Sequence, residues 1–404
     1  MLSRFSIHPR RPASTSRRQQ PRPPFPHNTP DDDTPASDYH YSPPVPRRDD
    51  ASSSTSSPFH SSLGSPPSMY PGPAFTYDFT AHARPASPTP SVYSLTSSTI
   101  ERSFKKVAGR FVNARSDVYG LPADDLEVKR LDNQHYMFKS IWGSIYFGPV
   151  EEVLAPSDGP QKAILDLGCG SGLWAIEMAT MFPHCTVVGV DLAPIQTSYI
   201  PPPNFRVEVD DVNLGLEHFE GQFDLVHSRF ISTGIKDYFG LIDQISRVLR
   251  PGGLLLLHET DFRAYDSKHE IIEPVEYGHP RHAFLPHFLA KFRSAAHARR
   301  GNLDAAWLTE GWLSEHRAYV DVDTFDSWVP TGQFFPPECQ QENVVGGMMR
   351  NDLTAFIFSC RTVFEGYGAP DELEFLERNV LAEVEAARIP MWMRVKSVWA
   401  RRRS

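Results

Sequence analysis

The stretch ILDLGCGSGLWAIEMA, from Ile164 to Ala179, constrains the fold of this chain more than any other. A short apolar run is followed by Gly168, Gly170 and Gly172 at alternate positions, and then by a helical pattern. Glycines let backbone approach a ligand closely, and the free N–H groups at a helix start favour negative charge. The stretch therefore predicts a strand, a ligand-binding turn and a helix in succession.

Short apolar runs and helical patterns alternate after this point, which is typical of a parallel sheet covered by helices. Proline and two glycines in LRPGG, residues 249–253, predict the end of the second helix and a turn into the next strand. The predicted strands are 163–167, 186–190, 205–209, 223–227 and 254–259, and the predicted helices are 172–182 and 237–249.

The segments around this core are less regular. We expect helices across the ligand cleft in 104–154, and a helical insertion or lid at about 262–315. A strand is predicted at 317–325, helices in 344–387, and a final strand at 391–400.

The first hundred residues differ in composition from the rest. They hold 19 of the 37 prolines, many serines and few apolar residues, so they cannot bury enough surface to offset the entropy of ordering. We predict a disordered region at 1–100 and a folded domain at 101–404. The latter carries 31 basic and 42 acidic residues, a balance that argues against direct nucleic-acid binding.

Four cysteines without CxxC spacing indicate a reducing, intracellular compartment, and no apolar run approaches the ~20 residues that span a membrane. Arginines at positions 10, 11, 17, 18 and 401–403 are read either as nuclear import signals or as solvated charges on loose chain ends. The predicted location is cytoplasmic or nuclear.

Acidic residues follow the next two strands. Asp191 ends the second strand, where a carboxylate can accept both hydroxyls of a ribose. After the third strand, Asp210 or Asp211 could accept from an adenine amino group, with the N–H of Val212 serving a ring nitrogen. The dinucleotide fingerprint GxGxxG requires a glycine where this chain has Leu173, so an NAD-dependent oxidoreductase is disfavoured.

ILDLGCGSG, VVGVDLAP, VEVDDVN, FDLVHSRF and ISRVLRPGGLLLLHE together resemble the ordered motifs of class I S-adenosylmethionine-dependent methyltransferases. The flanking stretches VYGLPADDLEVKRLDNQHYMF and AIEMATMFPHCTVVGVDLAPIQTSYIPPPNFRVEVDD are similar to the fungal LaeA-like methyltransferases, a family linked to the regulation of secondary metabolism. The resemblance implies an α/β, Rossmann-like, doubly wound sheet of seven strands in the order 3-2-1-4-5-7-6, with the last strand antiparallel.

The same resemblance implies the cofactor S-adenosyl-L-methionine and its site. Asp166, Gly168 and Gly170 would surround the methionine part, Asp191 would hold the ribose, and Asp211, with Asp210 as the competitor, would hold the adenine amino group. The full predicted cofactor site is Asp166, Gly168, Cys169, Gly170, Gly172, Asp191, Leu192, Asp210, Asp211 and Val212.

Methyl transfer from a sulfonium depends mainly on alignment, so no fixed catalytic dyad is expected, although a hydroxyl or ammonium acceptor benefits from a general base. The candidates are His227 and Arg229 after the fourth strand and His258, Glu259 and Asp261 after the fifth. His258 and Glu259 cannot both face the substrate from a regular strand. For either histidine taken alone, we favour the interpretation as a buried structural residue over that as a base.

Other chemistry-bearing residues have structural interpretations that we favour. His279, His282 and His287 read as solvated imidazoles of a lid helix rather than as zinc ligands, and no metal is predicted. Trp142, Tyr146 and Phe147 could stack on an acceptor but are typical of a core. Cys169 reads as a space-filling residue rather than as a nucleophile.

Two functions remain open from the sequence. One is a methyltransferase acting on a small metabolite or a regulatory protein. The other is a regulatory scaffold that binds the cofactor and protein partners with little catalysis. Membrane association is not expected.

Overall fold

The central sheet of the molecule has seven strands, and the computed structural model describes residues 102–194 and 199–404. The expected disorder of 1–100 lies outside the described residues. The strand order is β5-β4-β3-β6-β7-β9-β8, which is the expected order 3-2-1-4-5-7-6. The strands are β3 (Ala163–Leu167), β4 (Thr186–Asp191), β5 (Phe205–Val209), β6 (Phe223–Arg229), β7 (Leu249–Tyr265), β8 (Tyr319–Pro330) and β9 (Trp392–Arg402).

Strand direction also agrees with the expectation. Neighbouring strands from β5 to β7 are parallel, whereas β9 is antiparallel to both β7 and β8. Parallel strands place their carboxyl ends at one edge of the sheet, so the turns that follow β3, β4, β5 and β6 lie side by side.

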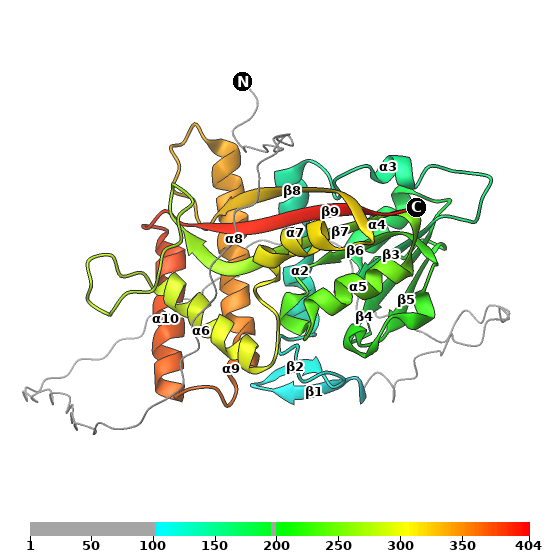
Figure 1. Cartoon of the computed structure of the whole chain (residues 1–404). Coiled ribbons are helices and arrows are strands. Elements are labelled where there is room, and N and C mark those ends of the chain that lie inside the picture. Colours follow the sequence, from blue (N-terminus) through cyan, green and yellow to red (C-terminus); the bar gives the residue numbers. More distant parts are fainter. Residues whose placement is uncertain (1–101, 195–198) are drawn as a thin grey trace, which may run out of the picture. The chain divides into compact units, whose positions relative to one another are not determined.

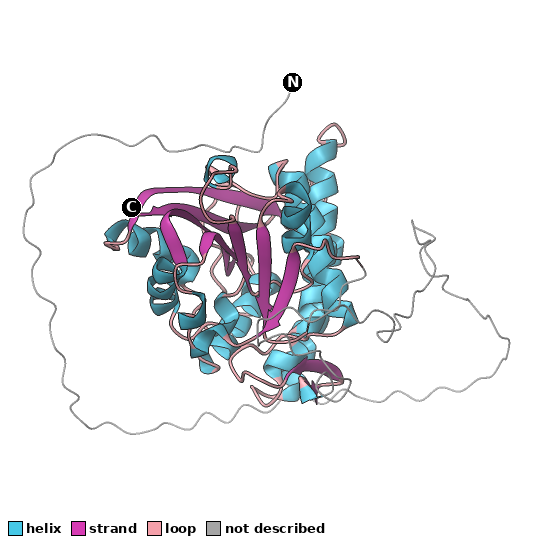
Figure 2. Ribbon diagram, turned by 90° about the vertical axis from the view of Figure 1, so that its right-hand side faces the viewer, coloured by secondary structure: helices cyan, strands magenta, loops and turns pink. Residues whose placement is uncertain are grey.

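Both faces of the sheet are covered, as Figure 2 shows. Adjacent residues of β3 point to opposite faces: Ile164 packs in one apolar cluster with α3 (Val150–Val153) and α4 (Leu173–Met181), whereas Leu165 packs in another with α5 (Tyr238–Val248) and α7 (Ala305–Glu315). This is the alternation that a strand buried on two sides requires.

A third apolar cluster is built mostly from helices outside the alternating core. It unites α2 (Asp125–Trp142), α6 (Phe284–Ala298), α8 (Gln340–Ser359), α9 (Arg361–Phe364) and α10 (Pro370–Ala386) with the ends of β7, β8 and β9. In Figure 1 the long helices α8 and α10 run side by side at the end of the sheet opposite α3. No helix of the described chain is long and apolar enough to cross a membrane.

Some expected boundaries were wrong. Residues 104–113, expected to be helical, form the hairpin β1 (Phe104–Val107) and β2 (Arg110–Asn113), because Ala108 and Gly109 adopt the positive φ angles of a tight hairpin turn. Residues 262–265 continue β7, and the first helix after it starts only at Phe284.

The C-terminal arginines are not on a loose end. Arg401 and Arg402 belong to β9, and Arg401 pairs with Glu152 at 2.8 Å. Arg403 donates from Nε to the carbonyl oxygen of Arg317 at 2.9 Å. These three residues are part of the folded domain, so the reading of them as free solvated charges was wrong.

Candidate functional site

The glycine loop between β3 and α4 adopts a conformation that only glycine tolerates easily. Gly168, Gly170 and Gly172 have φ angles of 68°, 57° and 77°. The N–H groups of Gly168 and Cys169 both donate to the carbonyl oxygen of Val190, at 2.8 and 3.0 Å, which fixes the loop against the end of β4. A Cβ atom on Gly168 would lie 2.4 Å from Cγ2 of Ile231.

Asp191, at the end of β4, belongs to the same arrangement. Its Oδ2 accepts the N–H of Gly170 at 2.8 Å and its Oδ1 accepts the N–H of Ala193 at 3.3 Å. Burial raises the pKa of Asp191 to about 6, and these backbone hydrogen bonds oppose the shift. Each carboxylate oxygen has a second lone pair, so Asp191 can still accept from a ligand.

The acids after β5 are organised by their own backbone. Asp210 Oδ1 accepts the N–H of Asp211 at 2.8 Å, while Asp211 Oδ1 accepts the N–H and the Nδ2 group of Asn213 at 3.0 and 2.7 Å. Asp211 thereby caps the short 3₁₀ turn Val212–Leu214. Each acid already has one oxygen in use, so the geometry does not choose between them.

One cavity joins these elements at the carboxyl edge of the sheet. Among the predicted cofactor residues, nine line it: Asp166, Gly168, Cys169, Gly170, Asp191, Leu192, Asp210, Asp211 and Val212. Gly172 lies outside the cavity lining and instead precedes the first residue of α4 as its N-terminal cap.

The same cavity extends beyond the glycine loop to an apolar end. We call this part the apolar end. Its walls come from α2, α8, the residue that follows β6, the C-terminal parts of β7 and β8, and the N-terminal part of β9. The side chains are Met137, Phe138, Phe230, Phe262, Val329, Met349, Leu353, Phe356, Met393 and Val395.

Of the five candidate bases, only His227 and Arg229 line the cavity. His258 and Glu259 point to opposite sides of the sheet, as expected for neighbours on a strand. His258 Nδ1 lies 2.9 Å from Ser397 Oγ, and its ring packs against Trp142. Glu259 Oε1 accepts the N–H groups of Ile231 and Ser232, at 3.0 and 3.1 Å, so this side chain holds the turn after β6.

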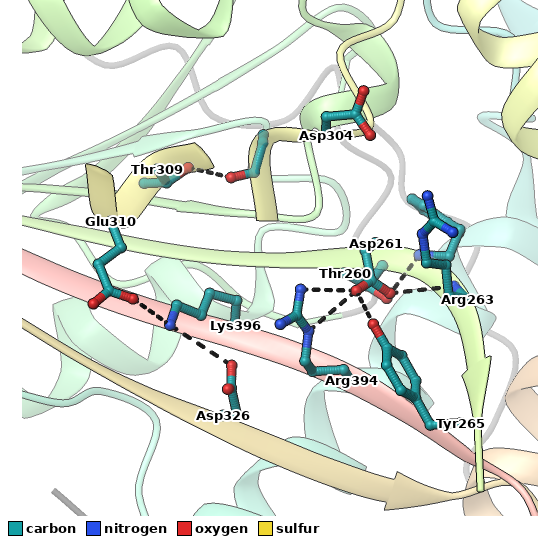
Figure 3. Close-up of polar contacts among 12 residues, drawn as sticks. Thr260, Asp261, Arg263, Tyr265, Asp304, Thr309, Glu310, Asp326, Arg394 and Lys396 are labelled. Atoms are coloured by element: carbon teal, nitrogen blue, oxygen red, sulfur yellow. Dashed lines mark hydrogen bonds and ion pairs between the residues drawn. The ribbon is translucent and has the colours of Figure 1, made fainter. Parts of the chain in front are cut away.

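Asp261 is directed away from the cavity into a buried ion pair. Its Oδ2 lies 2.8 Å from Arg394 Nη2 and also accepts the hydroxyl of Tyr265. Figure 3 shows the three side chains converging between β7 and β9. The candidacy of Asp261 as a base was therefore wrong. The strand pattern misplaced it because β7 is irregular between Thr260 and Ala264, where Phe262 has φ 50°.

His227 forms a buried pair with Asp166 of the neighbouring strand. His227 Nδ1 lies 2.7 Å from Asp166 Oδ1, and the imidazole is stacked on Trp174 with ring centroids 3.6 Å apart. Burial raises the pKa of Asp166 to about 8 and lowers the pKa of His227 well below its ordinary value. Both shifts favour the uncharged form of this pair, and both residues line the cavity.

Comparison with known proteins agrees with this geometry. A family model described as a methyltransferase domain matches residues 136–300. The secondary metabolism regulator laeA of Coprinopsis cinerea is 36% identical over 296 residues, which cover 73% of each chain. The methyltransferase pytC of Aspergillus terreus is 30% identical over 304 residues, or 74% of this chain and 88% of pytC. This chain belongs to the LaeA-like class I methyltransferase family.

Solved methyltransferase structures superpose only loosely on this LaeA-like chain. Phosphoethanolamine N-methyltransferase 2 of Haemonchus contortus, in complex with S-adenosyl-L-methionine, is 16% identical with a TM-score of 0.34, covering 70% of this chain and 60% of that one. Coclaurine N-methyltransferase is 18% identical with a TM-score of 0.35, covering 63% and 70%. Likenesses at this level do not bear on substrate.

Several cavity residues of this LaeA-like methyltransferase escaped the sequence reasoning. Arg130 on α2 bonds Glu127 on the same helix at 2.7 Å and Asp352 on α8 at 2.9 Å. Gln134 Nε2 also donates to Asp352, at 3.2 Å. The i, i+3 and i, i+7 spacing from Glu127 marks one face of α2, but nothing local identifies Asp352, which is 222 residues from Arg130.

The alternatives raised for other residues are decided by their contacts. Trp142 belongs to the third apolar cluster and does not line the cavity. The Cys169 thiol is buried, and burial raises its pKa well above the ordinary value, which suits a space-filling role. His282 Nδ1 and His287 Nε2 lie 3.1 and 2.6 Å from the carbonyl oxygen of Val275, and both side chains are partly buried. The expectation of solvated imidazoles on a lid helix was therefore wrong for these two residues, and only His287 lies on α6. Within the described ranges, no group of three His, Cys, Asp or Glu side chains could hold a metal.

Proposed function

We propose that this LaeA-like methyltransferase transfers a methyl group from S-adenosylmethionine to a small, largely apolar acceptor. The observation that carries the proposal is the single cavity that runs from the glycine loop to the apolar end. A bisubstrate reaction needs the two reactants side by side in one space, and alignment supplies much of the rate of such a displacement.

The residues of the loop end fit the cofactor. Glycine at positions 168 and 170 allows the tight loop, since a Cβ there would collide with Ile231 or approach Leu131 to 3.0 Å. Asp191 has acceptor capacity left for a ribose, and Asp210 or Asp211 for the adenine amino group. When bound, the cofactor supplies an electrophilic methyl group on a sulfonium whose departure as a neutral thioether is favourable.

The apolar end supports a small acceptor over a protein side chain. Aromatic and aliphatic residues from six separate parts of the chain enclose it, among them Phe138 of α2, Phe356 of α8 and Val395 of β9. Burying an apolar molecule there is favourable, at roughly 25 cal/mol per Å² of apolar surface. A few polar groups, such as Thr260 and Gln134, would orient it.

Calorimetric titration tests the cofactor assignment. We expect S-adenosylhomocysteine to bind and NAD not to bind, and Asp191→Ala to weaken binding at least tenfold because it frees the glycine loop as well as the ribose site. Binding of NAD without S-adenosylhomocysteine would overturn the proposal. Labelled methyl donor added to a cell extract should then label small molecules.

A regulatory scaffold is the second candidate, favoured by the name of the Coprinopsis relative, secondary metabolism regulator. Under that function the methyl label would reach no acceptor although the cofactor binds, and protein partners would be recovered with the chain instead. Four free cysteines support a reducing compartment, the cytoplasm or the nucleus, for either function.

A further inference from the structure

Arg229 carries a charge that no carboxylate of the described chain neutralises. It is the last residue of β6, lies partly buried and lines the cavity. Within residues 102–194 and 199–404, no acidic oxygen lies within 4.0 Å of its guanidinium, whereas other cavity or near-cavity arginines such as Arg130 and Arg394 have such partners. A charge in this position is costly unless a partner of opposite charge arrives.

Among the described residues, one side-chain hydrogen bond orients Arg229 without neutralising it. Its Nη2 lies 3.3 Å from His135 Nδ1, and because arginine can only donate, His135 accepts there and carries its proton on Nε2. That Nε2 lies 3.5 Å from Glu177 Oε1, and Glu177 is already paired with Lys139 at 2.8 Å. Among the described residues, the other N–H groups of the Arg229 guanidinium have no hydrogen-bond partner, and Arg229 lines the cavity.

The position of Arg229 in the sheet indicates which anion it meets. The register pairs Asp166 with His227 and Leu167 with Ser228, so Arg229 stands opposite Gly168 at the end of the neighbouring strand. Across the carboxyl edge, the order is the acids after β5, Asp191 after β4, the glycine loop after β3, and then Arg229 after β6. The cofactor has the same chemical order: adenine, ribose, sulfur and amino acid.

We infer that Arg229, positioned by His135, binds the α-carboxylate of the methionine part of the cofactor. The inference rests on the proposed function and adds a named anion subsite to it. The planar guanidinium can take a carboxylate through two parallel hydrogen bonds, which are stronger than neutral ones and specific in direction. Arg229 is thus a binding residue and not a general base.

The test compares two ligands on two proteins by calorimetric titration. S-adenosylhomocysteine carries the carboxylate, and its decarboxylated analogue keeps the amine but lacks that group. We expect the intact protein to prefer S-adenosylhomocysteine by about tenfold or more, the scale of a charge-assisted contact. In Arg229→Gln the preference should fall below about twofold, because the partner of the carboxylate is gone.

Two further variants keep the test decisive. Arg229→Lys retains the charge but cannot make two parallel hydrogen bonds, so its preference for S-adenosylhomocysteine should be intermediate. This variant replaces Arg229→Gln in the test if Arg229→Gln does not fold. Arg250→Gln removes a partly exposed arginine bound to Asp224 at the opposite edge of the sheet, and should keep the full preference.

Failure of the inference and failure of the proposed function look different. If the intact protein binds both ligands equally, or if Arg229→Gln retains the preference, or if the variant weakens both ligands by the same factor, the carboxylate subsite is wrong while cofactor binding stands. If the intact protein binds neither ligand, the proposed function itself is overturned.

Discussion

Asp166 and His227 face each other across two parallel strands, with Oδ1 and Nδ1 2.7 Å apart. Burial raises the pKa of Asp166 to about 8 and lowers that of His227 well below its ordinary value. Both shifts favour the uncharged pair, in which the carboxyl O–H of Asp166 would donate to Nδ1 of His227.

This pair predicts a fall in stability on the alkaline side. The unfolded chain loses the Asp166 proton at about pH 3.9, while the folded chain keeps it up to about pH 8, so stability from this group declines as pH rises toward 8. His227 has the opposite sign: its folded pKa is lowered, so its contribution is complete above its unfolded pKa of about 6.5 and is lost as pH falls. Between about pH 6.5 and pH 8, therefore, only the titration of Asp166 changes the stability that this pair contributes.

We expect Asp166→Asn to remove that part of the slope. The free energy of unfolding, measured in urea at pH 6.5 and pH 8.0, should fall for the intact protein by on the order of 1 to 2 kcal/mol more than for the variant. The asparagine amide can still donate to His227, so the fold is retained. Equal slopes in the two proteins would show that Asp166 is ionised at pH 6.5.

Alanine substitutions at Gly168 and Gly109 distinguish the cost of a positive φ angle from the cost of a steric clash. Both have positive φ, at 68° and 80°, but a Cβ at Gly109 meets nothing within 4 Å, whereas at Gly168 it meets Ile231 at 2.4 Å. Gly109→Ala should cost about 1 to 2 kcal/mol of stability and leave S-adenosylhomocysteine binding intact. Gly168→Ala should cost about 1 to 3 kcal/mol more and abolish binding.

Urea unfolding and calorimetric titration of both glycine variants provide the check. Retained binding in Gly168→Ala would show that the loop can shift away from Ile231, and that its tight conformation is not needed by the cofactor.

Asp261 and Arg394 form a buried ion pair, and breaking it should strongly lower the stability of the folded protein. Asp261 is fully buried, and the Arg394 guanidinium also lies over the Trp307 ring at 3.8 Å. Asp261→Ala leaves the arginine charge unpaired and should cost about 3 to 5 kcal/mol. By contrast, Glu310→Gln breaks the half-exposed pair with Lys396, whose atoms lie 2.7 Å apart, and should cost under about 1 kcal/mol. Figure 3 shows this pair beside the Asp261–Arg394 pair.

The double variant Asp261→Leu with Arg394→Met distinguishes a structural role from a catalytic one. It should recover most of the lost stability, together with S-adenosylhomocysteine binding and methyl transfer. A stable double variant that binds the cofactor product but transfers no methyl group would return Asp261 to the list of candidate bases.

The sequence predicted those parts of the site whose signals are local. Gly168 and Gly170 lie within one turn, and Asp191 ends a short apolar strand, so spacing alone indicated that they share an edge. The strand order followed from family resemblance, because the pairing of β9 with β7 joins residues about 140 positions apart.

Local sequence patterns could not predict contacts between segments that lie far apart in the chain. Asp261 occupies a suitable strand position, but its direction depends on an irregularity in β7 and on Arg394, 133 residues later. Arg130 was not singled out from its local sequence, because its partner Asp352 comes from α8, 222 residues away. The apolar end is built in the same way, from side chains that no single stretch of sequence brings together.

Met349 provides the sharpest test of the proposed acceptor site. It lies buried on α8 and lines the apolar end of the cavity, away from the glycine loop. Met349→Trp should fill part of that end, leave S-adenosylhomocysteine affinity within about twofold, and lower methyl transfer in extract at least tenfold, at a stability cost of about 1 to 3 kcal/mol from overpacking. Val344→Trp, on the exposed side of the same helix, should change neither quantity. Undiminished transfer by a folded Met349→Trp protein would place the acceptor elsewhere, whereas loss of cofactor-product affinity would show that the cofactor itself reaches this helix.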